Sequence, residues 1–178
     1  MKKSKLIGTI VVVTLVLFFA YIGFVCFGRY KLVGMTFLNS RFDKTADYFN
    51  TTNIGEYEDV YFQLYHQNML IFASDATTLV ATYSDTEYAK QVEKLQQEIT
   101  FLEKSQYGVH GDFDINNWHF EVCTPEKTEL PKDFAMIAFN DKECKIAYLE
   151  FYDKDLDRIS EDDGMVGFID FYFKYKFK

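Results

Sequence analysis

The chain has 178 residues, of which 48% are hydrophobic and 19% aromatic, with only two prolines. This composition excludes a disordered chain and a proline-rich linker, and the length allows one ordinary domain with an appendage. The first 29 residues carry four basic residues and no acidic one, which leaves 15 of the 19 basic residues against all 27 acidic ones, a net charge of −12. Because the chain after residue 29 is this acidic, it would be repelled by phosphate groups. This excludes nucleic acid as a partner and disfavours electrostatic docking on anionic lipid.

The N-terminal region contains 22 consecutive uncharged, mostly apolar residues, from Leu6 to Phe27. A helix of this length measures about 33 Å, close to the roughly 30 Å of a hydrocarbon core. A cleaved signal peptide would have a shorter apolar region and a small-residue cleavage site, and bulky Phe24 and Val25 argue against lipid attachment at Cys26. The sequence therefore predicts an uncleaved transmembrane anchor at residues 6–28, in contact with the lipid bilayer.

The charges that flank this anchor predict its orientation. Lys2, Lys3 and Lys5 precede it, and Arg29 and Lys31 follow it. This small excess favours a cytoplasmic N-terminus at residues 1–5 and an extracellular C-terminal domain, in a protein that crosses the cell membrane once. The Phe-, Tyr-, Lys- and Asp-rich composition resembles that of proteins from low-GC Gram-positive bacteria.

Residues 29–56 are polar and predict a juxtamembrane stalk. The domain proper is expected at residues 57–178. Its first part contains three aromatic or β-branched runs, "VYFQLY", "MLIFA" and "TLVATY", with "HQN" as a turn between the first two. Each run predicts one strand.

After these three runs, the spacing of the apolar residues changes to that of a helix. Apolar residues follow one another at spacings of four and three, and Ser84 with Glu87 forms a capping-box pattern. The spacing predicts one amphipathic helix over residues 85–104, with this apolar stripe: Tyr88, Val92, Leu95, Ile99 and Leu102.

Four strands are expected after the helix, at residues 118–123, 134–140, 144–152 and 169–178, the last from its strict alternation of aromatic and polar residues. The order is strand-strand-strand-helix-strand-strand-strand-strand. Short connections favour antiparallel neighbours, so we expect an α+β fold in which an antiparallel sheet has the long helix packed on one face.

The cysteines and histidines show no pattern that is typical of catalysis or of metal binding. In the expected meander, Cys123 and Cys144 lie about 20 Å apart, too far for a disulfide. His66, His110 and His119 have no metal-ligand spacing, and nothing supplies the third group that a Cys123–His119 pair would need. We therefore predict no catalytic, cofactor-binding or metal-binding residue.

The stretch "FYDKDLDRISEDDG" resembles the start of a calcium loop, with Asp153, Asp155 and Asp157 at alternate positions. Arg158 replaces the glycine expected at position six, and Gly164 replaces the glutamate expected at position twelve. We interpret this stretch as a solvated crossing between the last two strands, with at most weak calcium binding.

Most aromatic residues are expected in the core, Trp118 among them, and outward Tyr172 with Tyr61 or Tyr65 is the remaining candidate binding patch. The leading functional hypothesis is a non-enzymatic binding or interaction module with a membrane or envelope protein as partner. Two alternatives stay open: a cell-envelope enzyme that uses acidic residues with His110 or His119, and an immunity-type protein that binds a toxin.

Overall fold

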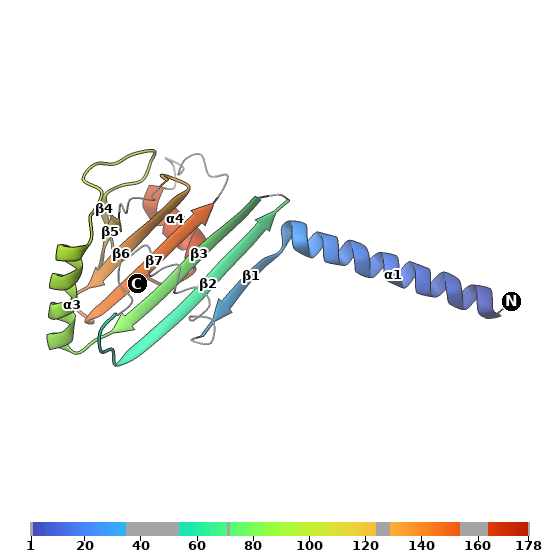
Figure 1. Cartoon of the computed structure of the whole chain (residues 1–178), viewed down its shortest axis with the longest axis horizontal. Helices are drawn as coiled ribbons and strands as arrows, with labels where there is room; N and C mark the ends of the chain where they lie inside the picture. The colour runs from blue at the N-terminus through green and yellow to red at the C-terminus, as the bar shows by residue number, and fades with distance from the viewer. Residues whose placement is uncertain (1, 35–53, 71, 124–128, 154–163, 178) are drawn as a thin grey trace.

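A computed structural model describes residues 2–34, 54–70, 72–123, 129–153 and 164–177. A long N-terminal helix, α1 (Lys2–Phe27), points away from the domain (Figure 1). Its segment Ile7–Phe27 is long and apolar enough to cross a membrane, and none of that segment is buried in the protein. The other described residues form an α+β domain around a seven-stranded antiparallel sheet.

The sheet contains β1 (Arg29–Val33), β2 (Asp59–Met69), β3 (Phe72–Thr82), β4 (Asp112–Ile115), β5 (Trp118–Cys123), β6 (Asp133–Asn140) and β7 (Lys145–Asp153). Their order is β1-β2-β3-β7-β6-β5-β4. The predicted meander of three strands at residues 118–152 is confirmed, because β5 pairs with β6 and β6 with β7. The predicted α+β class is confirmed as well.

Each face of the sheet has its own apolar core and its own cover. On the aromatic face lie Trp118, Phe120, Phe134 and Phe151. This face is covered by α4 (Gly164–Tyr172) and by the C-terminal segment 173–177. On the other face, called the α3 face, lie Phe62, Leu79, Ile137 and Tyr148, which pack with Tyr88 and Leu95 of α3 (Asp85–Glu98).

The first two predicted strand boundaries are wrong. The "HQN" stretch is not a turn: it lies inside β2, which pairs continuously with β3 from Asp59 to Met69. Of the run "MLIFA", Met69 ends β2 while Phe72 and Ala73 begin β3, the strand that also contains Thr78–Thr82 of "TLVATY". Alternation continues through the polar residues, so the ladder persists where local composition indicated a break.

The predicted helix over residues 85–104 ends at Glu98. Beyond Ile99 the chain is extended, Phe101 forms a bridge with Cys123, and the Leu102 amide donates to the Val122 carbonyl at 2.9 Å. The backbone therefore leaves the helix to pair with β5, although the apolar spacing continues to Leu102.

The predicted C-terminal strand is also wrong, since α4 and the segment after it occupy these residues. Met165, Phe168 and Ile169 are buried, at the spacing of a helix face, whereas Phe171 is 42% exposed. The alternation of residues 169–178 is thus only partly reflected in burial. A helix satisfies its own backbone while it covers the aromatic face.

Two strands lie where none was expected. Residues 29–33 of the predicted stalk form β1, which pairs with β2, and residues 112–115 form β4, which pairs with β5. Only Gly28 separates α1 from β1. A Cβ atom at this position would lie 2.2 Å from the Phe24 carbonyl oxygen, so the joint requires glycine.

Candidate functional site

The three cysteines are free. Cys123 pairs with Ala135 at the start of β6, while Cys144 follows the turn after β6, so the two lie at opposite ends of that strand, as expected. Cys123 is fully buried, and burial raises the pKa of its thiol far above the usual range. A hydrogen bond to Asp85 at 3.2 Å is the main cause that raises the pKa of Cys144. Neither thiol is therefore activated as a nucleophile.

Two histidines pair with carboxylates. His119 Nδ1 lies 2.8 Å from Asp114 Oδ1 on the outer edge of β4 and β5. His66 Nδ1 lies 2.6 Å from Asp75 Oδ1, and its Nε2 lies 2.7 Å from Asn68 Oδ1. Both ring nitrogens of His66 are thus engaged, which orients the imidazole without leaving one available to a substrate. His110 is exposed and lies in neither pair.

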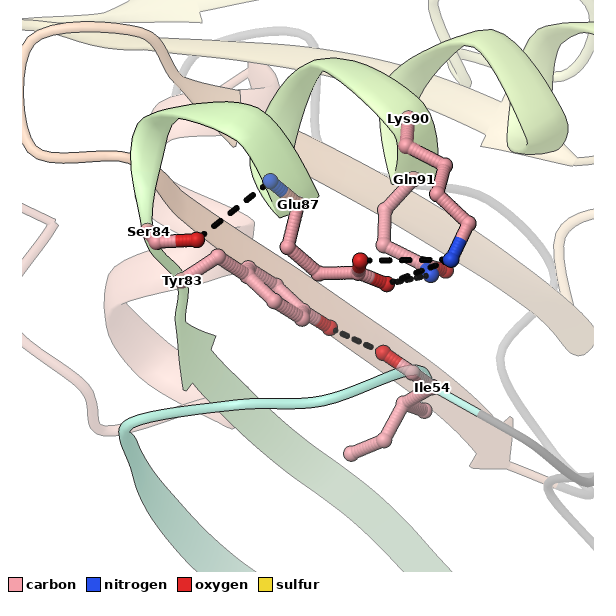
Figure 2. A network of polar contacts seen from close by, with 6 residues as sticks. All are labelled: Ile54, Tyr83, Ser84, Glu87, Lys90 and Gln91. Carbon is pink, nitrogen blue, oxygen red and sulfur yellow. Dashed lines mark hydrogen bonds and ion pairs between the residues drawn. The ribbon is translucent and has the colours of Figure 1, made fainter.

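A polar network that runs from exposed Ser84 and Lys90 to buried Tyr83 and Gln91 lies at the start of α3 (Figure 2). The Ser84 hydroxyl accepts from the Glu87 amide at 3.4 Å, which is one half of the predicted capping box. The Glu87 carboxylate accepts from Gln91 at 2.6 Å and from Lys90. The Tyr83 hydroxyl donates to the Ile54 carbonyl at 2.7 Å, and burial raises the pKa of Tyr83 to about 12. The Tyr83 hydrogen bond fastens Ile54 to the α3 face and the other contacts stabilise the first turns of α3, so the network has a structural role.

The predicted tyrosine patch is not formed. Tyr65 is buried, and the Tyr61 ring packs 5.2 Å from the Tyr175 ring. Tyr172 lies in α4, with its ring 4.6 Å from that of Phe151, and burial raises its pKa to about 12. Trp118 is buried as predicted. The hydroxyls of Tyr61 and Tyr65 donate to Gln63 and Gln67 of their own strand.

The structure instead forms a groove of about 630 Å³ between the β4–β5 turn, α4 and the C-terminal segment. Ile115, Tyr175 and Phe177 supply its apolar lining and are partly or fully buried. Four exposed charged side chains lie around it: Asp114, Asp170, Lys174 and Lys176. An apolar floor within a polar rim is the usual anatomy of a binding interface.

Several contacts hold the floor of this groove. Tyr175 lies 5.2 Å from Tyr61 on β2 and 6.3 Å from Trp118 on β5, so the segment reaches across the three strands between them. The Gln63 side-chain amide donates to the Phe173 carbonyl, and the Asn116 amide donates to the Phe177 carbonyl at 2.8 Å. The groove is therefore built on anchored backbone.

Sequence reasoning missed this groove because it placed residues 169–178 in a strand. The spacing of Met165, Phe168, Ile169 and Tyr172 is a helical signal that could have indicated α4. Nothing local indicates that the β4–β5 turn and the C-terminal segment meet.

Within the described residues, no three His, Cys, Asp or Glu side chains are arranged to hold a metal ion. Of the acidic stretch considered for calcium, Asp153 ends β7, and Asp155 and Asp157 lie outside the described residues. Comparisons with protein-family models, curated proteins and solved structures gave no match.

Proposed function

We propose that the chain is a single-pass membrane protein whose extracellular domain binds a segment of a membrane or envelope protein in the groove beside α4. The observation that carries this proposal is the groove itself, an apolar floor within a rim of two aspartates and two lysines. Its volume of about 630 Å³ falls within the roughly 300–1,000 Å³ of typical ligand sites.

The charges favour an extended peptide with charges of both signs. Asp170 and Lys174 are four positions apart and bring opposite charges to the same groove. Val166, on α4, is 49% exposed and adds apolar surface at its edge. A partner segment with a central apolar residue and flanking charges would match this arrangement.

The enzymatic alternative has one observation in its favour, since Asp114 lines the groove and also pairs with His119. No Ser, Thr or Cys is among the described residues that line the groove, so an aliphatic hydroxyl or thiol nucleophile is lacking there. The four charged side chains are also solvated. These features favour recognition over nucleophilic catalysis.

Site-specific photocrosslinking in intact cells tests the proposal. A photoreactive side chain at Val166 should yield a discrete adduct with a protein partner, and the same side chain at exposed Gln97 of α3 should not. Reversing two rim charges (Asp170→Lys with Lys174→Glu) should reduce the adduct. Equal adducts at both positions, or none at position 166, would contradict the proposal.

A further inference from the structure

The tip of the β2–β3 hairpin is fixed to the last turn of α1. The Leu70 amide donates to the Cys26 carbonyl at 2.5 Å, and the Asn68 amide donates to the Gly28 carbonyl at 2.8 Å. The first bond satisfies one of the last four carbonyls of α1, which have no partner within the helix, and the second fixes the residue that links α1 to β1. The tip therefore stays at the level of Cys26 along the helix axis.

That level is the edge of the hydrocarbon core if α1 spans a bilayer. The apolar run ends at Phe27, and its length of about 33 Å leaves little excess over a core of about 30 Å. Cys26 is one residue from that end. The Leu70 backbone, hydrogen-bonded to Cys26, then lies at the boundary between acyl chains and headgroups.

The residues of this turn are unusual for a turn in water. Met69 pairs with Phe72, which leaves a two-residue connection, and such connections favour Asn-Gly, Asp-Gly or Gly-containing pairs. The sequence has Leu70 and Ile71 instead. Leu70 has a φ of 60°, which is uncommon for a bulky residue, and is 60% exposed. An apolar environment outside the protein would account for this choice.

The neighbouring side chains fit the same boundary. Arg29 and Lys31 of β1 are exposed, and Tyr30 between them is half-buried. Basic and tyrosine side chains are enriched where a protein passes through the headgroup region. The net charge of −12 on the remaining chain argues against electrostatic attraction to anionic lipid, so the apolar contact must supply the binding.

We propose that the β2–β3 hairpin enters the membrane interface beside α1, with the Leu70 side chain in contact with lipid acyl chains. The inference rests on the proposed membrane anchoring and adds a second, peripheral contact to it. The contact is made to the acyl chains and needs no anionic headgroup.

Tryptophan quenching by brominated lipid tests this inference on the full chain in phosphatidylcholine vesicles. Leu70→Trp should show blue-shifted emission and should be quenched by bromines near the headgroup end of the acyl chain. Tyr107→Trp, at a position that is 66% exposed in the loop after α3, is the matched control and should not be quenched. Trp118 is buried and gives a constant background.

A third variant separates this inference from the anchor. Phe18→Trp lies near the middle of the apolar segment Ile7–Phe27 and should be quenched by bromines deep in the acyl chain. If Phe18→Trp is quenched and Leu70→Trp is quenched no more than Tyr107→Trp, the hairpin contact is wrong and the anchor stands. If Phe18→Trp is not quenched, both are wrong.

Cysteine labelling provides a measurement that does not place a large ring in the turn. In a background that carries Cys26→Ser and Cys144→Ser, Leu70→Cys in vesicles should react with a membrane-impermeant maleimide much more slowly than Tyr107→Cys. Both should react equally after denaturation. Equal rates in vesicles would overturn the proposal.

Discussion

On the α3 face of the sheet, hydrogen bonds position the covering helix α3. On the aromatic face, aromatic packing holds the cover, which consists of α4 and the C-terminal segment. α3 buries only Tyr88, Gln91 and Leu95, and it is bonded to the turn after β6 by the Tyr88 hydroxyl, which donates to Asp141 at 2.6 Å, and by Asp85, which accepts from Cys144 at 3.2 Å. α4 and the C-terminal segment bury Phe168, Phe173 and Phe177 among rings of four strands. Directional contacts position the first cover, and buried area stabilises the second.

The largest expected effect comes from the aromatic face. Phe173→Ala removes a fully buried ring and should lower the free energy of unfolding by about 3–5 kcal/mol. Denaturation of the full chain in detergent micelles, followed by Trp118 fluorescence, measures it, because Trp118 packs 5.2 Å from Phe177. Phe171→Ala, at a position that is 42% exposed, is the control and should cost about 0.5 kcal/mol or less. Similar losses in both variants would show that the aromatic cover is not a packed core.

On the α3 face, Ser84→Ala removes the side-chain acceptor at the start of the helix. The expected loss is about 0.5–1 kcal/mol, at the low end for helix caps because the hydrogen bond is long, at 3.4 Å. Ser84→Asp keeps an acceptor and should restore the stability. The same denaturation measurement applies. A loss as large as that of Phe173→Ala would remove the distinction between the two faces.

The smallest effect should be a gain. Glu121 lies on the α3 face, with Oε2 buried and without a hydrogen-bond partner among the described residues, and burial raises the pKa of this carboxyl. The folded state therefore binds the proton more tightly than the unfolded chain. The cost of the buried charge is present above the folded-state pKa and fades as the pH falls toward the unfolded value of about 4.3.

Glu121→Gln should thus be more stable than the parent protein near neutral pH, and the difference should shrink as the pH falls through this range. Denaturation curves at several pH values check the sign. Glu93→Gln, at an exposed position of α3, is the matched control for the loss of one carboxylate. A gain that persisted at acidic pH would mean that charge is not its cause.

The contrast between the faces also explains what the sequence could predict. The N-cap Ser84 and the apolar stripe of α3 lie close together in the sequence, so the existence and the start of this helix can be predicted. Its end is not, because Leu102 continues the stripe while its backbone bonds to Val122. For residues 164–177 the strand and helix periods are both present. Whether these residues form a helix or a strand depends on Phe134 and Phe151, which are distant in the sequence and are buried by Phe168 of the helix.

The candidate groove was unpredictable for the same reason. It joins Asn116 of the β4–β5 turn to Phe177 across 61 positions of the chain. The expected absence of a Cys123–Cys144 disulfide followed from strand geometry alone, and the strand order agrees with that geometry. Contacts within one meander could be inferred, and contacts between the meander and a distant segment could not.

The joint at Gly28 has a mechanical consequence. Because one residue links α1 to β1, and two hydrogen bonds tie the hairpin to the same turn, the domain cannot rotate independently of the helix. A membrane helix tilts when its apolar length exceeds the bilayer thickness. If α1 spans the membrane as proposed, a thinner bilayer would tilt the domain together with α1, and the groove would change its height above the lipid.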